Sequence, residues 1–266
     1  MLGAAGAIVL STTVGAVLAE GDGGPHPKLT TSLATNRRKS SPPHRIAPSP
    51  SPSPTHAASG TRGDVHHEAA APAEPVYYIH DGRKAIALTI DDGPSPEYTP
   101  QILRLLARYK VTASFSMIGR SVALYPEVAR EVAHAGHMIV NHTWDHSDVA
   151  TMTSVRVRNE IERATEAIHH ATGREPRMFR APYGAWSPTV LRYCEEHDLT
   201  ALDWSVDPRD WAMPGTRSII SNIMRYTHTG SIILEHDGGG NRSETVAALK
   251  VVIPRLLDEG YHFRLP

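Results

Sequence analysis

Hydrophobic and polar positions follow two different rhythms along residues 76–266. Short apolar runs are separated by longer stretches in which apolar residues recur three and four positions apart. Short apolar runs are typical of buried β-strands, and the longer spacing is typical of amphipathic α-helices. The alternation of the two predicts parallel strands joined by helical crossovers, which is an α/β fold.

The apolar runs mark the predicted strands. The first run reads Ala-Ile-Ala-Leu-Thr-Ile and contains no charged residue, as expected for a strand that is buried on both faces. The predicted strands are 85–90, 113–118, 137–141, 178–180, 200–205, 231–234 and 261–264. Seven or eight strand–helix units favour a closed ring over an open sheet. We therefore expect a distorted (β/α) barrel with seven or eight parallel strands.

Helix boundaries are marked by capping residues, prolines and glycines. Thr99 can cap a helix that has Pro100 at its first position, and Gly136 and Gly173 can end the two helices that precede them. The predicted helices are 99–109, 125–136, 154–172, 187–196, 217–226 and 243–257. Each lies between two predicted strands, as a crossover helix must.

The first 75 residues have a different character from the rest. Residues 1–19 are apolar or small and end in Val17-Leu18-Ala19, which fits a signal peptide or a membrane anchor, although no positive residue precedes the run. Residues 20–75 are rich in Pro and Ser and predict a disordered linker, either a spacer or a tail without a role. Residues 76–266 are long enough for one domain with its own core, which we expect to be catalytic.

Charge and cysteine content narrow the possible functions. The formal net charge is −1, so neither nucleic-acid binding nor attraction to a membrane surface is indicated. Cys194 is the only cysteine, which rules out an internal disulfide, and its place inside a predicted helix argues against a nucleophilic role. The chain has 16 histidines, and several of them stand in the linker without apolar neighbours. Histidine alone is therefore a weak signal here.

Polar residues gather at the carboxyl ends of the predicted strands. In a barrel of parallel strands this rim is where active sites are built, whereas structural polar residues would not need to share one rim. The residues at or just past these strand ends are Asp91, Asp92, His142, Arg180, Asp207 and His236. The pattern supports the barrel and a site on its rim together.

Asp92 and two histidines are candidate metal ligands. Asp91 and Asp92 are neighbours on an extended chain, so one can bind a metal while the other faces a reacting water. His142 and His146 are four residues apart, and one helical turn or a tight loop would place both rings on one side. Two imidazoles and one carboxylate leave a fourth position open, as catalytic zinc sites require. The alternative for Asp91 and Asp92 is a pair of aspartates that cap a turn. The alternative for His142 and His146 is one histidine in the core and one on the surface.

Arg180 and His236 are candidates for positioning and proton transfer. A buried arginine at the rim needs a carboxylate, and Asp91 is a candidate that would stay ionised as a general base. A histidine beside a carboxylate can stay protonated and donate to a leaving group, and Asp207 and Asp210 are its candidate partners. The alternatives are an ordinary structural ion pair and a histidine bonded to a backbone carbonyl.

Two further features complete the rim. Trp211 and Leu234 could form an apolar wall, and aromatic residues at a barrel mouth often contact sugar faces. Residues 238–240 are three glycines that lack the Lys-Ser/Thr of a phosphate-binding loop, so we interpret them as a flexible turn.

From about Lys84 to the C-terminus the sequence resembles polysaccharide deacetylases with a NodB homology domain, carbohydrate esterase family 4. All five family motifs occur in order, and the only departure is Ile90, where an aromatic residue is more usual. The matching segments are Thr-Ile-Asp-Asp-Gly at 89–93, His-Thr-Trp-Asp-His at 142–146, Arg-Ala-Pro-Tyr at 180–183, Asp-Trp at 210–211 and Leu-Glu-His at 234–236.

The resemblance implies a metal site and a base. Asp92, His142 and His146 would hold one divalent metal ion, usually Zn²⁺, with Co²⁺ or Ni²⁺ as alternatives. Asp91 would act as the general base, and Arg180 would orient it. The family fold is a distorted barrel, which agrees with the strand pattern.

The resemblance also implies an acid and a substrate pocket. His236 would protonate the leaving group, and Asp210 would tune its pKa. The backbone N–H of Tyr183 would help to bind the oxyanion, and Trp211 and Leu234 would line the pocket for the acetyl methyl group.

The implied reaction is hydrolysis of acetyl groups on a polysaccharide. N-deacetylation of N-acetylglucosamine in peptidoglycan or chitin-type polymers is our first hypothesis, and O-deacetylation of acetylxylan is the second. A non-catalytic carbohydrate-binding protein is a third, but such a protein would be expected to lack Asp91 or His236. We expect a monomer that binds no nucleic acid. It would be secreted or otherwise extracytoplasmic, and any contact with a membrane at the cell wall would be through the N-terminal segment.

Overall fold

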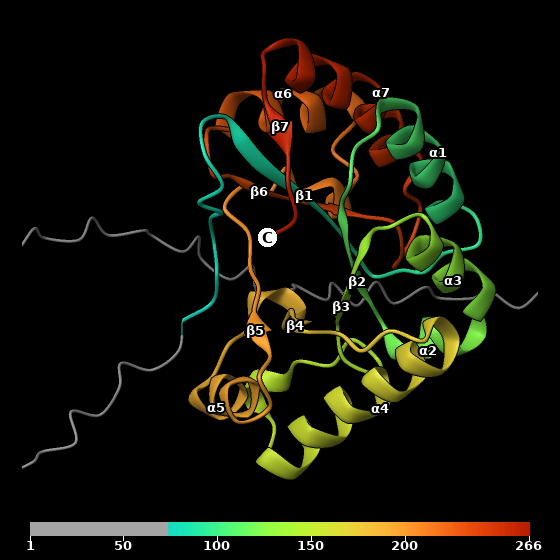
Figure 1. Ribbon diagram of the computed structural model, residues 1–266, viewed down its shortest axis with the longest axis vertical. Coiled ribbons are helices and arrows are strands. Elements are labelled where there is room, and N and C mark those ends of the chain that lie inside the picture. Colours follow the sequence, from blue (N-terminus) through green and yellow to red (C-terminus); the bar gives the residue numbers. More distant parts are fainter. Residues whose placement is uncertain (1–73) are drawn as a thin grey trace, which may run out of the picture. The chain divides into compact units, whose positions relative to one another are not determined.

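The computed structural model describes residues 74–266, in which strands and helices alternate (Figure 1). The predicted signal peptide or anchor at 1–19 lies outside the described residues, and so does the predicted linker as far as residue 73. The strands are β1 (Ala85–Asp91), β2 (Ser114–Met117), β3 (Met138–Asn141), β4 (Met178–Phe179), β5 (Thr200–Ala201), β6 (Ile232–His236) and β7 (His262–Phe263). The helices are α1 (Thr99–Tyr109), α2 (Gly119–Leu124), α3 (Pro126–His134), α4 (Ser154–Thr172), α5 (Pro188–Glu196), α6 (Thr216–Tyr226) and α7 (Ser243–Asp258).

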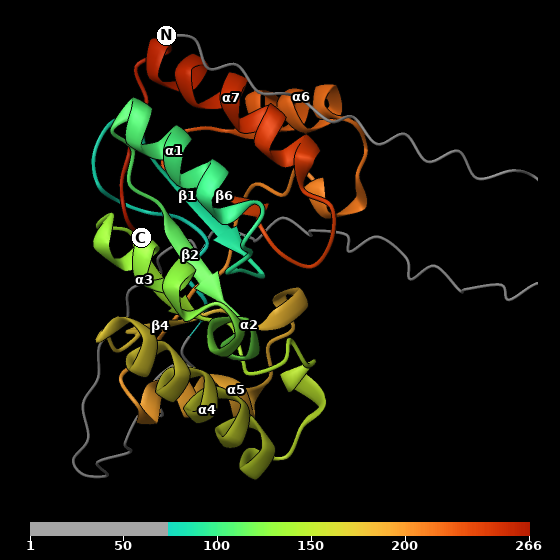
Figure 2. The same cartoon turned by 90° about the vertical axis from the view of Figure 1, so that its right-hand side faces the viewer.

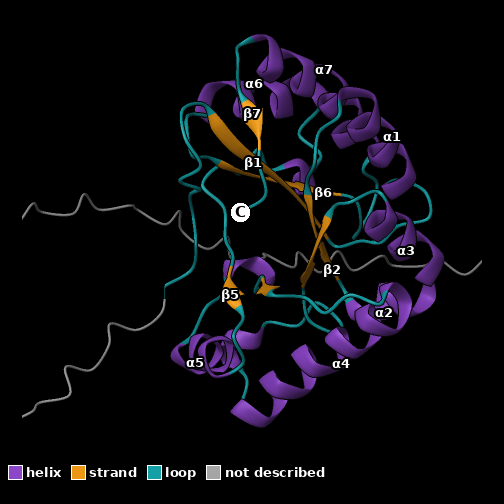
Figure 3. Ribbon diagram, in the orientation of Figure 1, coloured by secondary structure: helices purple, strands orange, loops and turns teal. Residues whose placement is uncertain are grey.

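The strands form one parallel sheet with the order β5-β4-β3-β2-β1-β6. The seventh strand, β7, pairs with the first residues of β1. Helices cover the outside of this sheet, as Figure 3 shows. The register of β1 places Asp91 opposite Ser116 on one side and His236 on the other. The prediction of a distorted (β/α) barrel with seven or eight parallel strands is confirmed, and residues 74–266 contain seven.

The two edges of the sheet approach each other through an irregular segment after β5. Val206 forms a single parallel bridge with Ile233, and the backbone N–H of Ser205 donates to the carbonyl of Ile232 at 3.0 Å. The strand predicted at 200–205 is therefore too long, because only Thr200–Ala201 is a strand. The reason is that the carbonyls of Leu202 and Asp203 accept hydrogen bonds from a buried arginine inside the barrel.

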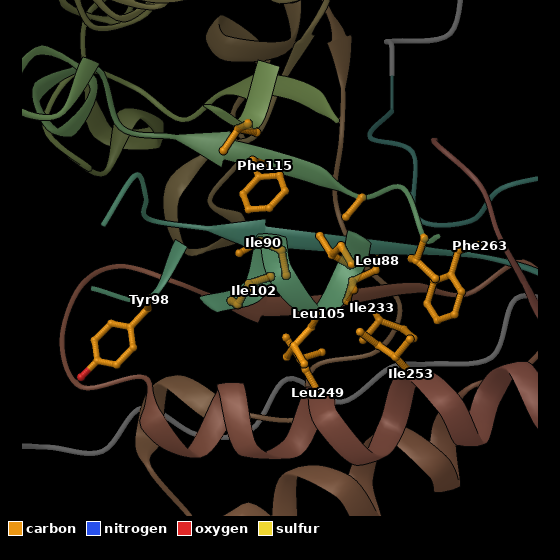
Figure 4. Close-up of a cluster of buried hydrophobic side chains, with 14 of the residues drawn as sticks. Leu88, Ile90, Tyr98, Ile102, Leu105, Phe115, Ile233, Leu249, Ile253 and Phe263 are labelled. Atoms are coloured by element: carbon orange, nitrogen blue, oxygen red, sulfur yellow. The ribbon is translucent and has the colours of Figure 1, made fainter. Parts of the chain in front are cut away.

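Side-chain alternation along β1 separates the core from the barrel interior. Ile86, Leu88 and Ile90 pack outward in the largest apolar cluster of the described residues. Figure 4 shows Leu88 and Ile90 beside side chains of α1 and α7. These two helices lie side by side over the sheet, as Figure 2 shows. The inward positions carry Ala87, Thr89 and Asp91, which are small or polar. The barrel interior therefore holds polar groups near the end of β1, beside a smaller apolar cluster that includes Ala87, Val140, Leu202 and Ile232.

The helix prediction missed one element. Helix α2 begins at Gly119, directly after the second strand, and is too short to show a helical period in the sequence. A Cβ atom at Gly119 would lie 2.6 Å from the Cα of Ala164 in α4, so glycine allows the two helices to pack closely. None of the helices in residues 74–266 combines the length and the apolar character needed to span a membrane.

Candidate active site

The backbone changes conformation between the two aspartates at the end of β1. Asp91 is the last residue of the strand and is buried, whereas Asp92 has a left-handed backbone with φ 75°. Two glycines allow other parts of the chain to pack closely against this turn. A Cβ at Gly93 would lie 2.3 Å from Oδ1 of Asp237, and a Cβ at Gly238 would lie 2.1 Å from the carbonyl oxygen of Asp92. The first glycine of the 238–240 turn thus allows the β6 loop to press against Asp92.

Arg180 is fully buried inside the barrel, where it holds Asp91. Its Nη1 donates to Oδ1 of Asp91 at 2.8 Å and to Oγ1 of Thr89 at 2.8 Å. Its Nη2 donates to the carbonyl of Asp203 at 2.9 Å. The guanidinium is thereby satisfied without solvent, and it fixes the orientation of the Asp91 carboxylate.

His142 follows β3 and presents one nitrogen to Asp92. Its Nδ1 lies 2.8 Å from the carbonyl oxygen of Arg180, which can only accept, so Nδ1 carries the proton. The lone pair of Nε2 is then free, and this atom lies 3.5 Å from Oδ1 of Asp92. A fixed tautomer of this kind is typical of histidines that bind metal ions.

His146 reaches the same carboxylate oxygen from a tight loop. Its Nε2 lies 3.2 Å from Oδ1 of Asp92. The loop is not a helical turn, because Thr143 and His146 have left-handed backbones with φ 66° and 67°. The hydroxyl of Thr143 accepts the backbone N–H of His146 at 3.0 Å and closes the loop. Nδ1 of His146 lies 3.2 Å from the hydroxyl of Tyr183.

The three side chains fit a divalent metal ion. One ligand atom from each of Asp92, His142 and His146 lies within 4.8 Å of the others. A tetrahedral zinc site places its ligand atoms roughly 3.3 Å apart, close to the 3.2 and 3.5 Å found here. Oδ1 of Asp92 is buried and has no hydrogen-bond partner among the described residues, as expected of a ligand atom.

His236 is paired with Asp210 on the opposite side of the pocket. Nδ1 of His236 donates to Oδ1 of Asp210 at 2.7 Å, and its backbone N–H donates to Oδ2 at 2.9 Å. The hydroxyl of Thr245 in α7 donates to the same Oδ2 at 2.7 Å. Burial lowers the pKa of His236, but the hydrogen bond and charge of Asp210 raise it to about 9. His236 is therefore protonated at neutral pH, with Nε2 left to face the pocket.

These groups line one pocket of about 340 Å³. Its walls are Asp91, Asp92, His142, His146, Tyr183, Trp204, Asp207, Trp211, Leu234 and His236. Tyr183 has a left-handed backbone with φ 63°, and its N–H donates no hydrogen bond within the described part of the chain. The pocket thus combines a metal-binding end, a protonated histidine and an apolar wall formed by Leu234 and Trp211.

Comparison with known proteins places the chain in a family. Residues 79–202 match the family model of polysaccharide deacetylase. A peptidoglycan-N-acetylglucosamine deacetylase of Bacillus cereus is 39% identical over 196 residues, which cover 71% of this chain and 92% of the relative. The chain belongs to the polysaccharide deacetylase family. It is an enzyme of that family, a hydrolase that acts on an acetylated polysaccharide.

Other relatives agree with this assignment. A chitooligosaccharide deacetylase of Bradyrhizobium is 39% identical over 192 residues, which cover 68% of this chain and 88% of the relative. The deacetylase also resembles the crystal structure of a peptidoglycan N-acetylglucosamine deacetylase in complex with a benzamide compound. That comparison has a TM-score of 0.69 and 32% identity, and it covers 71% of this chain and 88% of the other.

The structure brings the predicted site residues of the deacetylase together. It also decides between two candidate partners of His236 that the sequence left open. Asp207 and Asp210 were both candidate partners of His236, and Asp210 is the one that binds it, while Asp207 lines the pocket. Arg180 contacts Asp91, its predicted partner. Cys194 is buried away from the pocket, and burial raises its pKa to about 12, so its thiol is inert.

Three residues of the site were not found from the sequence. Thr89 supports Arg180, Thr245 supports Asp210, and Trp204 forms part of the pocket wall. Thr89 could have been found, because it precedes Asp91 by two residues and so faces the same side of the strand. Thr245 lies within a helix and Trp204 in an irregular segment, where periodicity carries no information about the pocket.

Proposed function

We propose that this deacetylase removes the N-acetyl group from N-acetylglucosamine residues of peptidoglycan or a chitin-type polymer in a metal-dependent reaction. The observation that carries the proposal is the convergence on one pocket of Asp91, protonated His236 and the three candidate ligands of a metal ion. Relatives named for peptidoglycan and for chitooligosaccharide substrates support the choice of N-acetylglucosamine.

Proton transfer in the proposed reaction is divided between two residues. Asp91 removes a proton from the attacking water, and the oxygen of that water forms a bond with the acetyl carbonyl carbon. The C–N bond then breaks as His236 gives its proton from Nε2 to the departing nitrogen. The products are acetate and a free amine on the sugar. An amine leaves poorly without a proton, so a histidine that is protonated at neutral pH suits an N-acetyl substrate.

The negative charge that develops on the carbonyl oxygen is stabilised from the other side of the pocket. The backbone N–H of Tyr183 is free to donate to this oxygen, a contribution typically worth about 3 kcal/mol. A divalent metal ion held by Asp92, His142 and His146, for which we favour zinc, would polarise the carbonyl and lower the pKa of a bound water. Leu234 and Trp211 form the apolar wall against which the acetyl methyl group would pack.

We also propose that the enzyme works outside the cytoplasm as a monomer. The support is the apolar run at residues 1–19 and the Pro/Ser-rich stretch that follows it. A spacer of this composition would let a catalytic domain reach into a cell wall, which favours peptidoglycan over a soluble chitin fragment.

Acetate release tests the proposal directly. The purified enzyme would be incubated with zinc and with three substrates in parallel, N-acetylated chitooligosaccharide, peptidoglycan and acetylxylan. We expect acetate and an equal amount of new free amine from one or both N-acetylated substrates, at a higher kcat/KM than acetate release from xylan. Release from acetylxylan alone would identify an O-deacetylase. Metal binding without acetate release from any of the three would identify a carbohydrate-binding protein.

A further inference from the structure

Glu235 is a buried carboxyl group next to the proton donor His236. Its side chain is fully shielded from solvent, and neither carboxyl oxygen has a hydrogen-bond partner that the geometry of the described residues establishes. Burying a carboxyl group without partners is costly, so a group of this kind needs a physical explanation. None of the roles assigned above uses it.

The charge state of Glu235 follows from its surroundings. Burial raises its pKa well above the usual range, and the nearby carboxylates of Asp210 and Asp207 raise it further, against a smaller lowering by Arg242. At neutral pH the group is therefore an uncharged acid with one O–H to donate. Among the charged groups, Asp210 has the largest effect on the pKa of Glu235. Its carboxylate can accept the proton of Glu235 in a hydrogen bond.

The position of Asp210 explains how two neighbouring residues of one strand can reach it. Successive side chains of β6 point to opposite faces, so Glu235 lies on the face opposite His236. Asp210 lies along the edge of β6, because its Oδ2 accepts the backbone N–H of His236. Thr245 reaches the same oxygen from α7, which covers the outer face of the sheet. The carboxylate is thus accessible from both faces.

We propose that Glu235 is a positioning residue for deacetylation: as a neutral acid it donates a hydrogen bond to Asp210 and so holds this carboxylate against His236. The proposal rests on the proposed function, because it assigns Glu235 a role in the proton transfer from His236. With Glu235 and Thr245 both donating, Asp210 is fixed from the outer side while His236 binds it from the pocket side. The imidazole ring is then held in the orientation that directs Nε2 toward the departing nitrogen.

The consequence is specific to one step of the reaction. Glu235 itself does not line the pocket, so its loss should leave KM and metal binding unchanged. It should lower kcat, and it should do so more for an amide than for an ester, because only the amide depends strongly on protonation of its leaving group. A residue that merely fills space would affect both substrates alike.

Three variants of the full-length enzyme separate these roles. Glu235→Met and Glu235→Leu introduce an apolar side chain of similar size that cannot donate a hydrogen bond. Glu235→Gln keeps a donor and cannot ionise. Each would be compared with the wild-type enzyme for zinc content, melting temperature, and kcat and KM on an N-acetylated chitooligosaccharide and on an O-acetylated sugar.

We expect both apolar variants to lose about tenfold in kcat on the N-acetyl substrate, as for one lost hydrogen bond to a charged group, with KM and zinc content unchanged. Glu235→Gln should retain most of the rate. Full activity of an apolar variant, an equal loss in the Gln variant, or an equal loss on both substrates would overturn the proposal. So would a failure of both apolar variants to fold, since that would make Glu235 a determinant of folding. A wild-type enzyme that releases no acetate would instead refute the proposed function itself.

Discussion

The guanidinium of Arg180 and the carboxylate of Asp91 form an ion pair of 2.8 Å inside the barrel, with both side chains shielded from solvent. A buried ion pair is a poor source of stability, because desolvation of the two charges offsets most of their attraction. Its value here is chemical. The ion pair holds the carboxylate of Asp91 in place at the end of β1, where it adjoins the pocket in which a base is needed.

Asp91→Asn should abolish turnover and leave metal binding intact. The amide has nearly the same shape but cannot take a proton from water, and we expect kcat to fall by at least about 10²-fold, the lower range for a general base. Zinc content and kcat on an acetylated oligosaccharide would be measured together. Asp92→Asn is the matched control, because it should weaken zinc binding as well as activity. A substantial rate in Asp91→Asn would refute the assignment of Asp91 as the base.

Removal of the metal ion should remove the activity. We expect a chelator to abolish acetate release and added Zn²⁺ to restore it, because Asp92, His142 and His146 supply the three ligands. His146→Ala should weaken zinc affinity by more than 100-fold, since loss of a group that only supports a ligand already costs about 10- to 100-fold. His169→Ala, an exposed histidine on α4, is the control and should bind zinc as the wild type does. Activity that survives complete removal of metal would contradict this prediction.

Local pattern and strand-end position were sufficient to predict much of this site. Asp91 and His236 stand at the ends of apolar strands, and parallel strands bring their ends to one rim, where the structure places these two residues opposite each other. The arrangement within the rim could not be predicted in the same way. Asp207 and Asp210 lie only three positions apart in sequence, and the irregular path of the chain after β5 decides that Asp210 reaches His236.

The fold, too, has some features that local sequence predicts and others that it does not. Strong apolar runs such as that of β1 are visible in the sequence because every residue of the strand is buried. The strand predicted at 200–205 was wrong in length, because Leu202 and Asp203 direct their carbonyls to Arg180, a contact between residues more than 20 positions apart. The left-handed backbone of His146 could not be predicted either, because few residues other than glycine adopt this conformation.

His236→Ala should slow N-deacetylation more than O-deacetylation. An amine needs a proton to leave, whereas an alkoxide leaves more readily, so we expect kcat to fall by about 10²- to 10⁴-fold on an N-acetyl substrate and by less on an ester. The two substrates would be compared by acetate release at saturating concentration. Equal losses on both would count against His236 as the acid.

Stability should depend on pH through His137, a histidine distant from the metal ligands. His137 is buried against Phe115, and its Nδ1 accepts the backbone N–H of Ala113 at 3.3 Å. Burial lowers its pKa from 6.5 to about 4. Between these values the unfolded chain binds a proton that the folded protein does not, so the free energy of unfolding falls as pH decreases, in total by about 3 kcal/mol.

Urea unfolding from pH 7 to pH 4, on the wild type and on His137→Gln, isolates this contribution. Glutamine can accept the same backbone hydrogen bond but does not titrate, so the variant lacks the loss that His137 causes. We expect any stability advantage of the wild type at pH 7 to shrink steadily below pH 6.5, because the other titrating groups act equally on both proteins. Parallel pH curves for the two proteins would show that His137 is protonated as readily in the folded state as in the unfolded chain.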